Sequence, residues 1–324
     1  MKKTTLCSHV TFGAATVALL AACAGIPEGT WSSNNDMPTG RWELATCSVD
    51  GKIYAIGGAG PVHEALATVE EYDPQTGTWK KKSDMPTPRQ GLSANVVDGK
   101  IYAIGGATSP SSAYGASVTT FSTVEIYDPA TDTWTSGADM PTARGFHSAN
   151  VVGGKIYVFG GSQDWSPNYK HVLVVEVYDP AHDSWTQLSE MPTARGAGFS
   201  SVVNGKIYLF GGYGGPQRVD EYNPRDDSWI QKTDMPTARH AHSSSVMNGR
   251  VFLVGGYDPF SGYTGLTKVD VYDPRRDVWM TAPNLPTGRF GLRTCVADGK
   301  IYAIGGMAYW IDAALGAVEE FSPE

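Results

Sequence analysis

The sequence predicts an all-β protein, a six-bladed β-propeller, from three features that recur together. A strand-like segment ending in two glycines occurs six times, at 52–58, 100–106, 155–161, 206–212, 250–256 and 300–306. Successive Gly-Gly pairs lie 48, 55, 51, 44 and 50 residues apart, a spacing typical of propeller blades. Each repeat also carries a third-strand aromatic residue and an outer tryptophan. These are Tyr72, Tyr127, Tyr178, Tyr222, Tyr272 and Phe321, and Trp31, Trp79, Trp134, Trp185, Trp229 and Trp279.

The second repeat shows how each blade is expected to be built. Ser93–Val97 is a strand of small residues, and Asp98-Gly99 is a tight turn that suits positive φ angles. Lys100–Ile104 is the second strand, Thr123–Tyr127 is the third, and the fourth centres on Trp134. Small residues suit the crowded inner strand near the axis, whereas tyrosine and tryptophan fill the wider gaps between outer strands.

The two ends of the repeat region predict how the ring closes. The region opens with a lone outer strand around Trp31 and finishes with a third strand, Val318–Phe321. We therefore expect these segments to pair inside the last blade, so that its outermost strand comes from the N-terminal side. Such pairing removes a loose sheet edge.

The net charge of the chain narrows its range of partners. Lys and Arg number 25 against 33 Asp and Glu, a formal charge of −8. Without residues 1–22, which carry Lys2 and Lys3, the balance is 23 against 33, or −10. A chain this acidic is a poor candidate for binding nucleic acid or an anionic membrane surface.

The first 22 residues are typical of a signal peptide. Lys2 and Lys3 precede an apolar segment at residues 12–22. Its length of about eleven residues falls short of the roughly twenty that span a bilayer. It fits the apolar region of a secretory signal.

The residues that follow predict a lipid anchor. Leu20-Ala-Ala-Cys23 resembles the lipobox of bacterial lipoproteins, in which the cysteine is acylated. We expect lipidation of Cys23, a tether over residues 23–29 and a propeller over 30–324, in a protein anchored in the bacterial envelope at the periplasm or outer membrane. The alternative is an ordinary signal peptide that is cut nearby.

The order of the conserved pieces within each repeat resembles the kelch repeat. Gly-Gly follows an apolar strand, and Tyr-Asp-Pro, Trp and Met-Pro-Thr-x-Arg come after it, over residues 30–324. Kelch proteins include adaptors that bind acidic peptides, actin-binding proteins, a copper oxidase and a bacterial sialic acid epimerase. The resemblance implies a binding or scaffold protein of the envelope. The alternative is a carbohydrate-active enzyme similar to the kelch-type epimerase (a mutarotase) or a uronide lyase.

One face of the predicted propeller carries the variable loops, and a repeated arginine enters that face in each blade. Guanidinium groups suit carboxylates and phosphates, and the resemblance implies that some arginines at this position contact ligand. The alternative is that each pairs with an acid on the third strand of its blade. The arginines are Arg41, Arg89, Arg144, Arg195, Arg239 and Arg289.

Three tryptophans depart from the repeat and are candidate ligand contacts. Trp42 follows Arg41, and Trp165 and Trp310 lie in the variable loops. Aromatic rings with polar edges suit sugar stacking or protein contacts. The alternative is that such rings plug the mouth of the central channel.

We recognise no catalytic constellation, and we expect no cofactor or metal. His240 and His242 lie two residues apart, but His147 occupies the repeat position of His242, which favours a structural role. The expected partner is a protein, an acidic peptide or a glycan, with a membrane contact only through the lipid anchor. We expect the protein to be a monomer.

Overall fold

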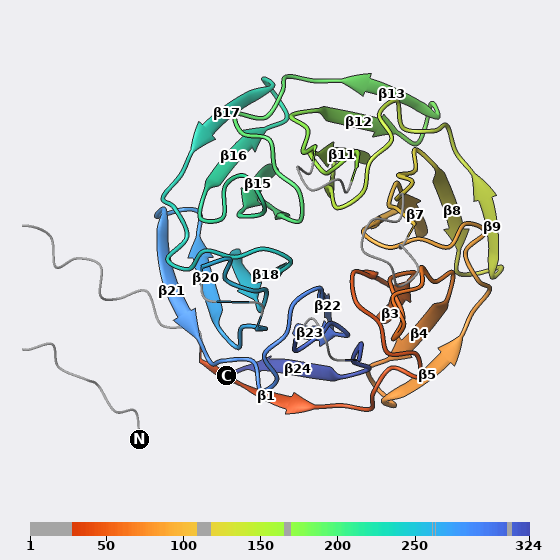
Figure 1. Cartoon of the computed structure of the whole chain (residues 1–324), viewed down its shortest axis with the longest axis vertical. Helices are drawn as coiled ribbons and strands as arrows, with labels where there is room; N and C mark the ends of the chain where they lie inside the picture. The colour runs from red at the N-terminus through yellow and green to blue at the C-terminus, as the bar shows by residue number, and fades with distance from the viewer. Residues whose placement is uncertain (1–27, 109–117, 165–169, 261, 263, 310–312) are drawn as a thin grey trace, which may run out of the picture.

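The computed structural model describes residues 28–108, 118–164, 170–260, 262, 264–309 and 313–324. Within these residues, 24 strands form six four-stranded antiparallel sheets. The sheets are arranged as blades around one axis (Figure 1). The predicted all-β, six-bladed propeller is therefore confirmed.

Each of the first five blades is formed by four consecutive strands, with the first strand innermost. Blade I holds β2 (Ala45–Val49), β3 (Lys52–Ile56), β4 (Val69–Asp73) and β5 (Thr78–Lys81); blade II holds β6 (Ser93–Val97), β7 (Lys100–Ile104), β8 (Val124–Asp128) and β9 (Thr133–Ser136). Blade III holds β10 (Ser148–Val152), β11 (Lys155–Phe159), β12 (Val175–Asp179) and β13 (Ser184–Gln187). Blade IV holds β14 (Phe199–Val203), β15 (Lys206–Phe210), β16 (Val219–Asn223) and β17 (Ser228–Gln231); blade V holds β18 (Ser243–Met247), β19 (Arg250–Val254), β20 (Val269–Asp273) and β21 (Val278–Ala282).

The two ends of the propeller region share the sixth blade. Blade VI has the order β1-β24-β23-β22, with β1 (Gly29–Ser33) outermost. The other three strands are β22 (Arg293–Ala297), β23 (Lys300–Ile304) and β24 (Val318–Pro323). Trp31 lies opposite Phe321 in the β1–β24 ladder, and Figure 1 shows the two strands side by side. The predicted closure is confirmed.

Aromatic residues hold neighbouring blades together at the outer strands. In blade II, Tyr127 is fully buried and lies opposite Trp134, with ring centroids 5.0 Å apart. The indole N–H of Trp134 donates to the carbonyl of Ser83 in the preceding connection, at 3.0 Å. Equivalent hydrogen bonds to the preceding connection are made by Trp31, Trp79, Trp185 and Trp279, whereas the buried indole nitrogen of Trp229 has no partner among the described residues.

An aspartate completes this contact in blades II to V. The carboxylate of Asp132 accepts hydrogen bonds from the Tyr127 hydroxyl and from the backbone N–H of Ser83. The same Tyr–Asp bond occurs at Tyr178–Asp183, Tyr222–Asp227 and Tyr272–Asp277. Blade I has Gly77 at this position, and the buried Tyr72 hydroxyl has no partner among the described residues.

The Gly-Gly pair ends each second strand where the next connection passes close by. Gly105 has φ 58°, and a Cβ at this position would lie 2.7 Å from the backbone oxygen of Arg144. The N–H of Gly106 donates to that same oxygen at 3.0 Å. Only a residue without a side chain permits this approach.

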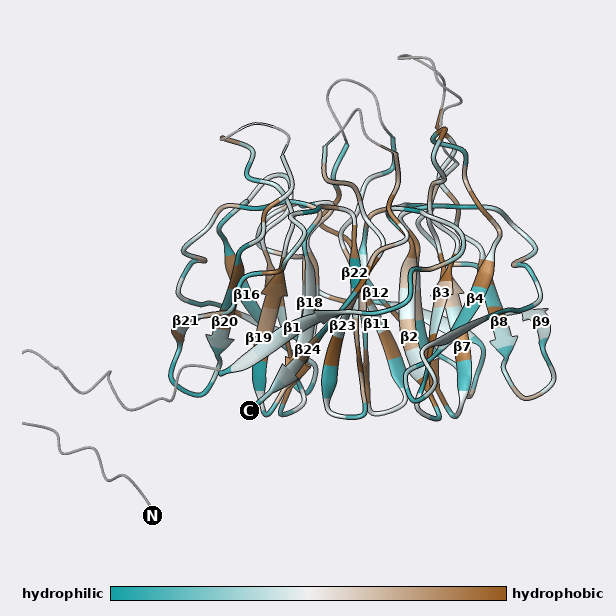
Figure 2. Ribbon diagram, turned by 90° about the horizontal axis from the view of Figure 1, so that it is seen from below, coloured by the Kyte–Doolittle hydropathy of each residue, from teal (hydrophilic) through white to brown (hydrophobic). Residues whose placement is uncertain are grey.

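The two faces of the propeller differ in their connections (Figure 2). On one face, which we call the hairpin face, two-residue turns such as Asp98-Gly99 join the first and second strands. Both turn residues have positive φ, as type I′ hairpins require. On the opposite face, which we call the loop face, the connections from second to third strands run from eight residues (211–218) to nineteen (105–123).

Among the described residues, no helix has the length and apolar character needed to cross a membrane. Residues 1–22, over which a signal peptide is predicted, and Cys23 lie outside the described residues.

Candidate functional site

The six repeated arginines lie inside their blades, each in its own ion pair. Their side chains are at most 4% exposed, and each pairs with an acid on the third strand of the same blade. The pairs are Arg41–Glu70, Arg89–Glu125, Arg144–Glu176, Arg195–Asp220, Arg239–Asp270 and Arg289–Glu319.

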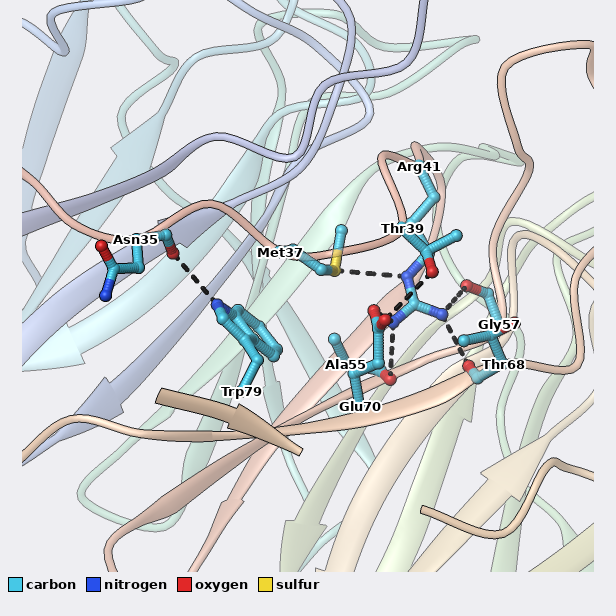
Figure 3. Close-up of polar contacts among 9 residues, drawn as sticks. All are labelled: Asn35, Met37, Thr39, Arg41, Ala55, Gly57, Thr68, Glu70 and Trp79. Atoms are coloured by element: carbon cyan, nitrogen blue, oxygen red, sulfur yellow. Dashed lines mark hydrogen bonds and ion pairs between the residues drawn. The ribbon is translucent and has the colours of Figure 1, made fainter. Parts of the chain in front are cut away.

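The Arg41 site shows how the repeat sequence creates such a pair (Figure 3). The guanidinium donates to Glu70 at 2.7 Å and to the backbone oxygens of Thr68 at 2.6 Å and Ala55 at 3.2 Å. Thr39 donates its hydroxyl to the other oxygen of Glu70 at 3.0 Å, and the sulfur of Met37 lies 3.3 Å from Nε of Arg41. Met-Pro-Thr-x-Arg is therefore the sequence of a buried arginine clamp.

Where the acid is aspartate, a second cation takes the place of the threonine contact. Glu125 and Glu176, like Glu70, accept a hydrogen bond from the threonine two residues before the arginine. The shorter Asp220 is instead held by both Arg195 and Arg218. Asp270 likewise faces Arg239 and the amine of Lys268. Each buried carboxylate therefore keeps at least two polar partners.

Burial lowers the pKa of the clamp arginines, while the paired carboxylates oppose that shift. The pKa of Arg41 falls to about 10, mainly through loss of solvent, with Glu70 acting in the opposite direction. Arg89 shows the same balance with Glu125. The guanidinium groups therefore stay charged at neutral pH, and removing one partner would leave an uncompensated buried charge.

This arrangement bears out the pairing alternative for the arginines. The structure distributes them over six separate clamps and does not gather them at the loop face. Direct ligand contact by any of the six stays a prediction. Since their side chains are buried, such contact requires the clamp to open.

A second repeated position forms a closed ring of backbone hydrogen bonds around the axis. The residue two positions after each arginine donates its N–H to the carbonyl of the equivalent residue in the preceding blade, at 2.7–3.0 Å. All six have positive φ, between 47° and 63°, although four are not glycine. We call this the axial ring; its members are Glu43, Gly91, Phe146, Ala197, Ala241 and Gly291.

Aromatic side chains cover the loop-face side of the axial ring. Trp42 is 5% exposed and packs edge-on against the buried Phe290, in a cluster that also includes Ala241 and Tyr257. Trp42 therefore lies where the alternative interpretation put it, in the packing that plugs the mouth of the central channel. Trp165 and Trp310 lie outside the described residues.

On the hairpin-face side of the axial ring, the six innermost strands surround a cavity of about 250 Å³ along the axis. We call it the axial cavity. Most of its lining is polar, from serine, threonine, asparagine and histidine side chains on all six blades. These include Thr46, Ser93, Asn95, His147, Ser148, Asn150, Ser200, Ser243, Ser244 and Thr294.

One cation lines this cavity among the described residues, and it breaks the sixfold pattern. Arg293 occupies a position that is Ala45 in blade I and Ser93 in blade II. Its guanidinium lies 4.5 Å from the ring centroid of Phe199 and pairs with Glu43 of the axial ring at 3.0 Å. The sequence does not mark Arg293 as a site residue, because it stands in an inner strand and not in a variable loop.

Two family models match the chain. The Attractin/LZTR1 beta-propeller model matches residues 28–220, and the KLHDC2/KLHL20/DRC7 Kelch-repeats domain model matches residues 136–306, each more than half of the chain. The chain belongs to the kelch-repeat β-propeller family.

Curated kelch relatives resemble part of this chain. Kelch-like protein 36 of Rattus norvegicus is 29% identical over 185 residues, which are 56% of this chain and 29% of that protein. Kelch-like protein 7 of Rattus norvegicus is 42% identical over 197 residues, 61% of this chain and 32% of that protein. The chain thus spans about a third of the length of these relatives. The solved structure of YjhT aligns with TM-score 0.76 at 17% identity, covering 90% of this chain and 99% of that one, and shows the shared fold.

The loop face of this kelch propeller carries exposed apolar side chains. Val62 is 71% exposed, Phe260 is 80% exposed and Tyr309 is 42% exposed. They stand in the second-to-third-strand loops of blades I, V and VI, which are neighbours in the ring. We call these three residues the apolar loop patch.

The histidines near the axis are held in the neutral form. His147 is 5% exposed, its Nε2 lies 3.1 Å from the Ser93 hydroxyl, and burial lowers its pKa to about 3. His242 is fully buried against Phe199, and its pKa is also well below the usual range through burial. No group of three or more histidine, cysteine, aspartate or glutamate side chains in the described part of the chain is arranged to hold a metal.

Proposed function

We propose that this kelch propeller is a binding or scaffolding protein of the bacterial envelope whose partner contacts the loop face. The observation that carries the proposal is the apolar loop patch of Val62, Phe260 and Tyr309 on three adjacent blades. The three residues share one face of neighbouring blades, and exposed apolar residues gathered on one face mark interaction sites more often than residues scattered over a surface do. Variable loops on a rigid scaffold are also where recognition residues concentrate.

The chemistry of this face favours a protein surface or a glycan over an acidic peptide. The six arginines that would attract acidic groups are buried in clamps with their own carboxylates. Phe260 and Tyr309 instead present aromatic surface, which packs against apolar side chains or the faces of sugar rings.

The test compares capture of partners by the wild-type propeller and by a variant that lacks the apolar loop patch. Val62→Ser, Phe260→Ser and Tyr309→Ser are combined, and binding is measured on envelope extracts, glycan arrays and peptide arrays. The matched control is Ile230→Ser, because Ile230 is 54% exposed on the outer strand β17 and away from the loop face. A partner that binds wild type and the control, but not the triple variant, supports the proposal.

A partner that binds all three proteins equally would place recognition elsewhere and reject the loop face. NMR assays of sugar anomer exchange and uronide cleavage on the same protein address the enzymatic alternative. Turnover at catalytic enzyme concentrations would replace the binding role.

The envelope location rests on the N-terminal sequence. Lys2, Lys3 and the apolar segment at 12–22 support export, and Leu20-Ala-Ala-Cys23 supports acylation. Two or more acyl chains on one cysteine hold a protein on a membrane far more firmly than one. In cell fractionation, Cys23→Ala is expected to move the protein from membranes to the soluble fraction, and an unchanged distribution would reject the anchor.

A further inference from the structure

We infer that the axial cavity is a binding site for a small neutral polyhydroxy compound, a polyol or a monosaccharide. The inference is independent of the partner proposed for the loop face. Its first basis is size and polarity. At about 250 Å³ the cavity far exceeds the 10–15 Å³ or so that one water needs. Its walls carry hydroxyl and amide groups from all six blades.

The second basis is that some polar groups of the lining are open to an occupant. Many lining groups pair with one another, such as Ser243 with Thr294 and His147 with Ser93. Ser148 is half-buried and lines the cavity, and its hydroxyl makes no hydrogen bond to the described residues. Polar groups inside a protein are normally satisfied, so we expect this hydroxyl to bind whatever fills the cavity.

The mixture of these groups favours a ligand that both donates and accepts hydrogen bonds. Serine and threonine hydroxyls do both, and asparagine amides carry donors and acceptors side by side. A simple anion would leave the acceptors unused, and an apolar ligand would leave open hydroxyls such as that of Ser148 unsatisfied. Hydroxyl groups of a polyol match both kinds.

The charge of the cavity lining also favours a neutral ligand. Arg293 is the cation of the lining, and Glu43 neutralises it at 3.0 Å. Phe199 further covers one face of the guanidinium. Because His147 is neutral at physiological pH, the cavity carries no net charge that would select an anion.

The ligand reaches the cavity from the hairpin face. On the other side, the axial ring closes the backbone around the axis, and Trp42 and Phe290 cover it. Towards the hairpin face, the next-to-last residue of five inner strands is a half-buried valine, and two of these valines, Val96 and Val151, line the cavity. A polyol at the axis and a partner on the loop face therefore occupy opposite sides of the axial ring.

The experiment measures binding of glycerol and D-glucose to the full propeller by ligand-observed NMR titration, with acetate and inorganic phosphate as anionic probes. Ser148→Ala removes a cavity hydroxyl that makes no hydrogen bond to the described residues, so thermal stability should be unchanged while affinity falls about three- to tenfold. Ala149→Phe fills the cavity from strand β10 and should abolish binding. The matched control is Ser136→Ala, on the exposed outer strand β9, which should bind as wild type.

Two sets of results would overturn the inference. One is that neither polyol binds, or that the anions bind and the polyols do not. The other is that polyol binding survives Ala149→Phe in a folded variant, or falls equally in Ser136→Ala and Ser148→Ala. The triple variant of the apolar loop patch should bind the polyol normally, so this test and that of the proposed function fail separately.

Discussion

The interiors of the blades and the region around the axis differ in how regularly their residues recur from blade to blade. Inside the blades the same residues recur, and the arginine clamps occur in all six. Around the axis, Arg293 stands where four other blades have alanine or serine and blade IV has Phe199. A residue present in every blade is explained by the construction of a blade. A residue present once, such as Arg293, calls for another explanation, and ligand binding at the axis is the one that we propose.

The largest expected effect tests whether the repeated arginines are structural. Arg144→Ala leaves Glu176 charged and buried, so we expect a loss of about 3–5 kcal/mol in the free energy of unfolding. Urea denaturation measures it. The double variant Arg144→Met, Glu176→Met should be clearly more stable than Arg144→Ala. A near-neutral Arg144→Ala would contradict the clamp.

The Gly-Gly pair gives a matched comparison within one blade. Gly105→Ala is expected to cost about 2–4 kcal/mol, because positive φ strain adds to a Cβ 2.7 Å from the Arg144 oxygen. At Gly99, φ is 74° but no atom lies within 4 Å of a Cβ, so Gly99→Ala should cost only the strain, about 1–2 kcal/mol. Equal losses in urea denaturation would show that the close approach of neighbouring blades is unimportant.

The histidines of the axis predict a dependence of stability on pH. The folded pKa of His147 is about 3 against 6.5 for the free side chain, so between these values the unfolded chain binds one more proton. The contribution of neutral, buried His147 to the free energy of unfolding is complete above pH 6.5. As the pH falls below this value, that contribution is lost at about 1.4 kcal/mol per pH unit.

His147→Leu tests this contribution, since Leu44, Leu92 and Leu292 occupy the same position in other blades. Urea denaturation between about pH 4.5 and 7 should show a shallower loss of stability for the variant. Parallel curves for wild type and variant would mean that His147 is protonated in the folded protein.

The smallest expected effect is a gain in the free energy of unfolding, from a substitution in blade I. Gly77→Asp supplies blade I with the aspartate that blades II to V have, within reach of the unpartnered Tyr72 hydroxyl. A Cβ at Gly77 makes only ordinary contacts, the nearest at 3.5 Å. The new hydrogen bond should contribute about 1 kcal/mol. Strain at the positive φ of 67° offsets part of it, although the aspartates of blades II to V occupy positive φ as well, so we expect a net gain of a few tenths to about 1 kcal/mol. A double-mutant cycle with Tyr72→Phe should remove the gain, and a gain that persists would have another cause.

The sequence alone predicts the interiors of the blades better than the region around the axis. Periodicity predicts the six blades, their strands and the closure of blade VI, because Gly-Gly, Tyr and Trp each satisfy a local packing need. It leaves the role of Arg41 and its equivalents open, since a guanidinium suits a ligand carboxylate as well as Glu70. The structure decides between these by burial.

The axial ring and the ion pair beside it could not be predicted from periodicity. The axial ring is formed by backbone groups of residues as different as Glu43, Phe146 and Gly291, so no shared side chain marks it. The pairing of Arg293 with Glu43 joins residues 250 positions apart in the chain. Only the closed ring brings them together.

Hydrogen–deuterium exchange of the propeller, alone and with the partner that it captures, tests the central claim most directly. The account predicts added protection in residues 60–64, 257–260 and 307–309 on the loop face, and unchanged exchange in the hairpin turns such as 98–99. Protection confined to the hairpin turns, with exposed loops as before, would contradict it.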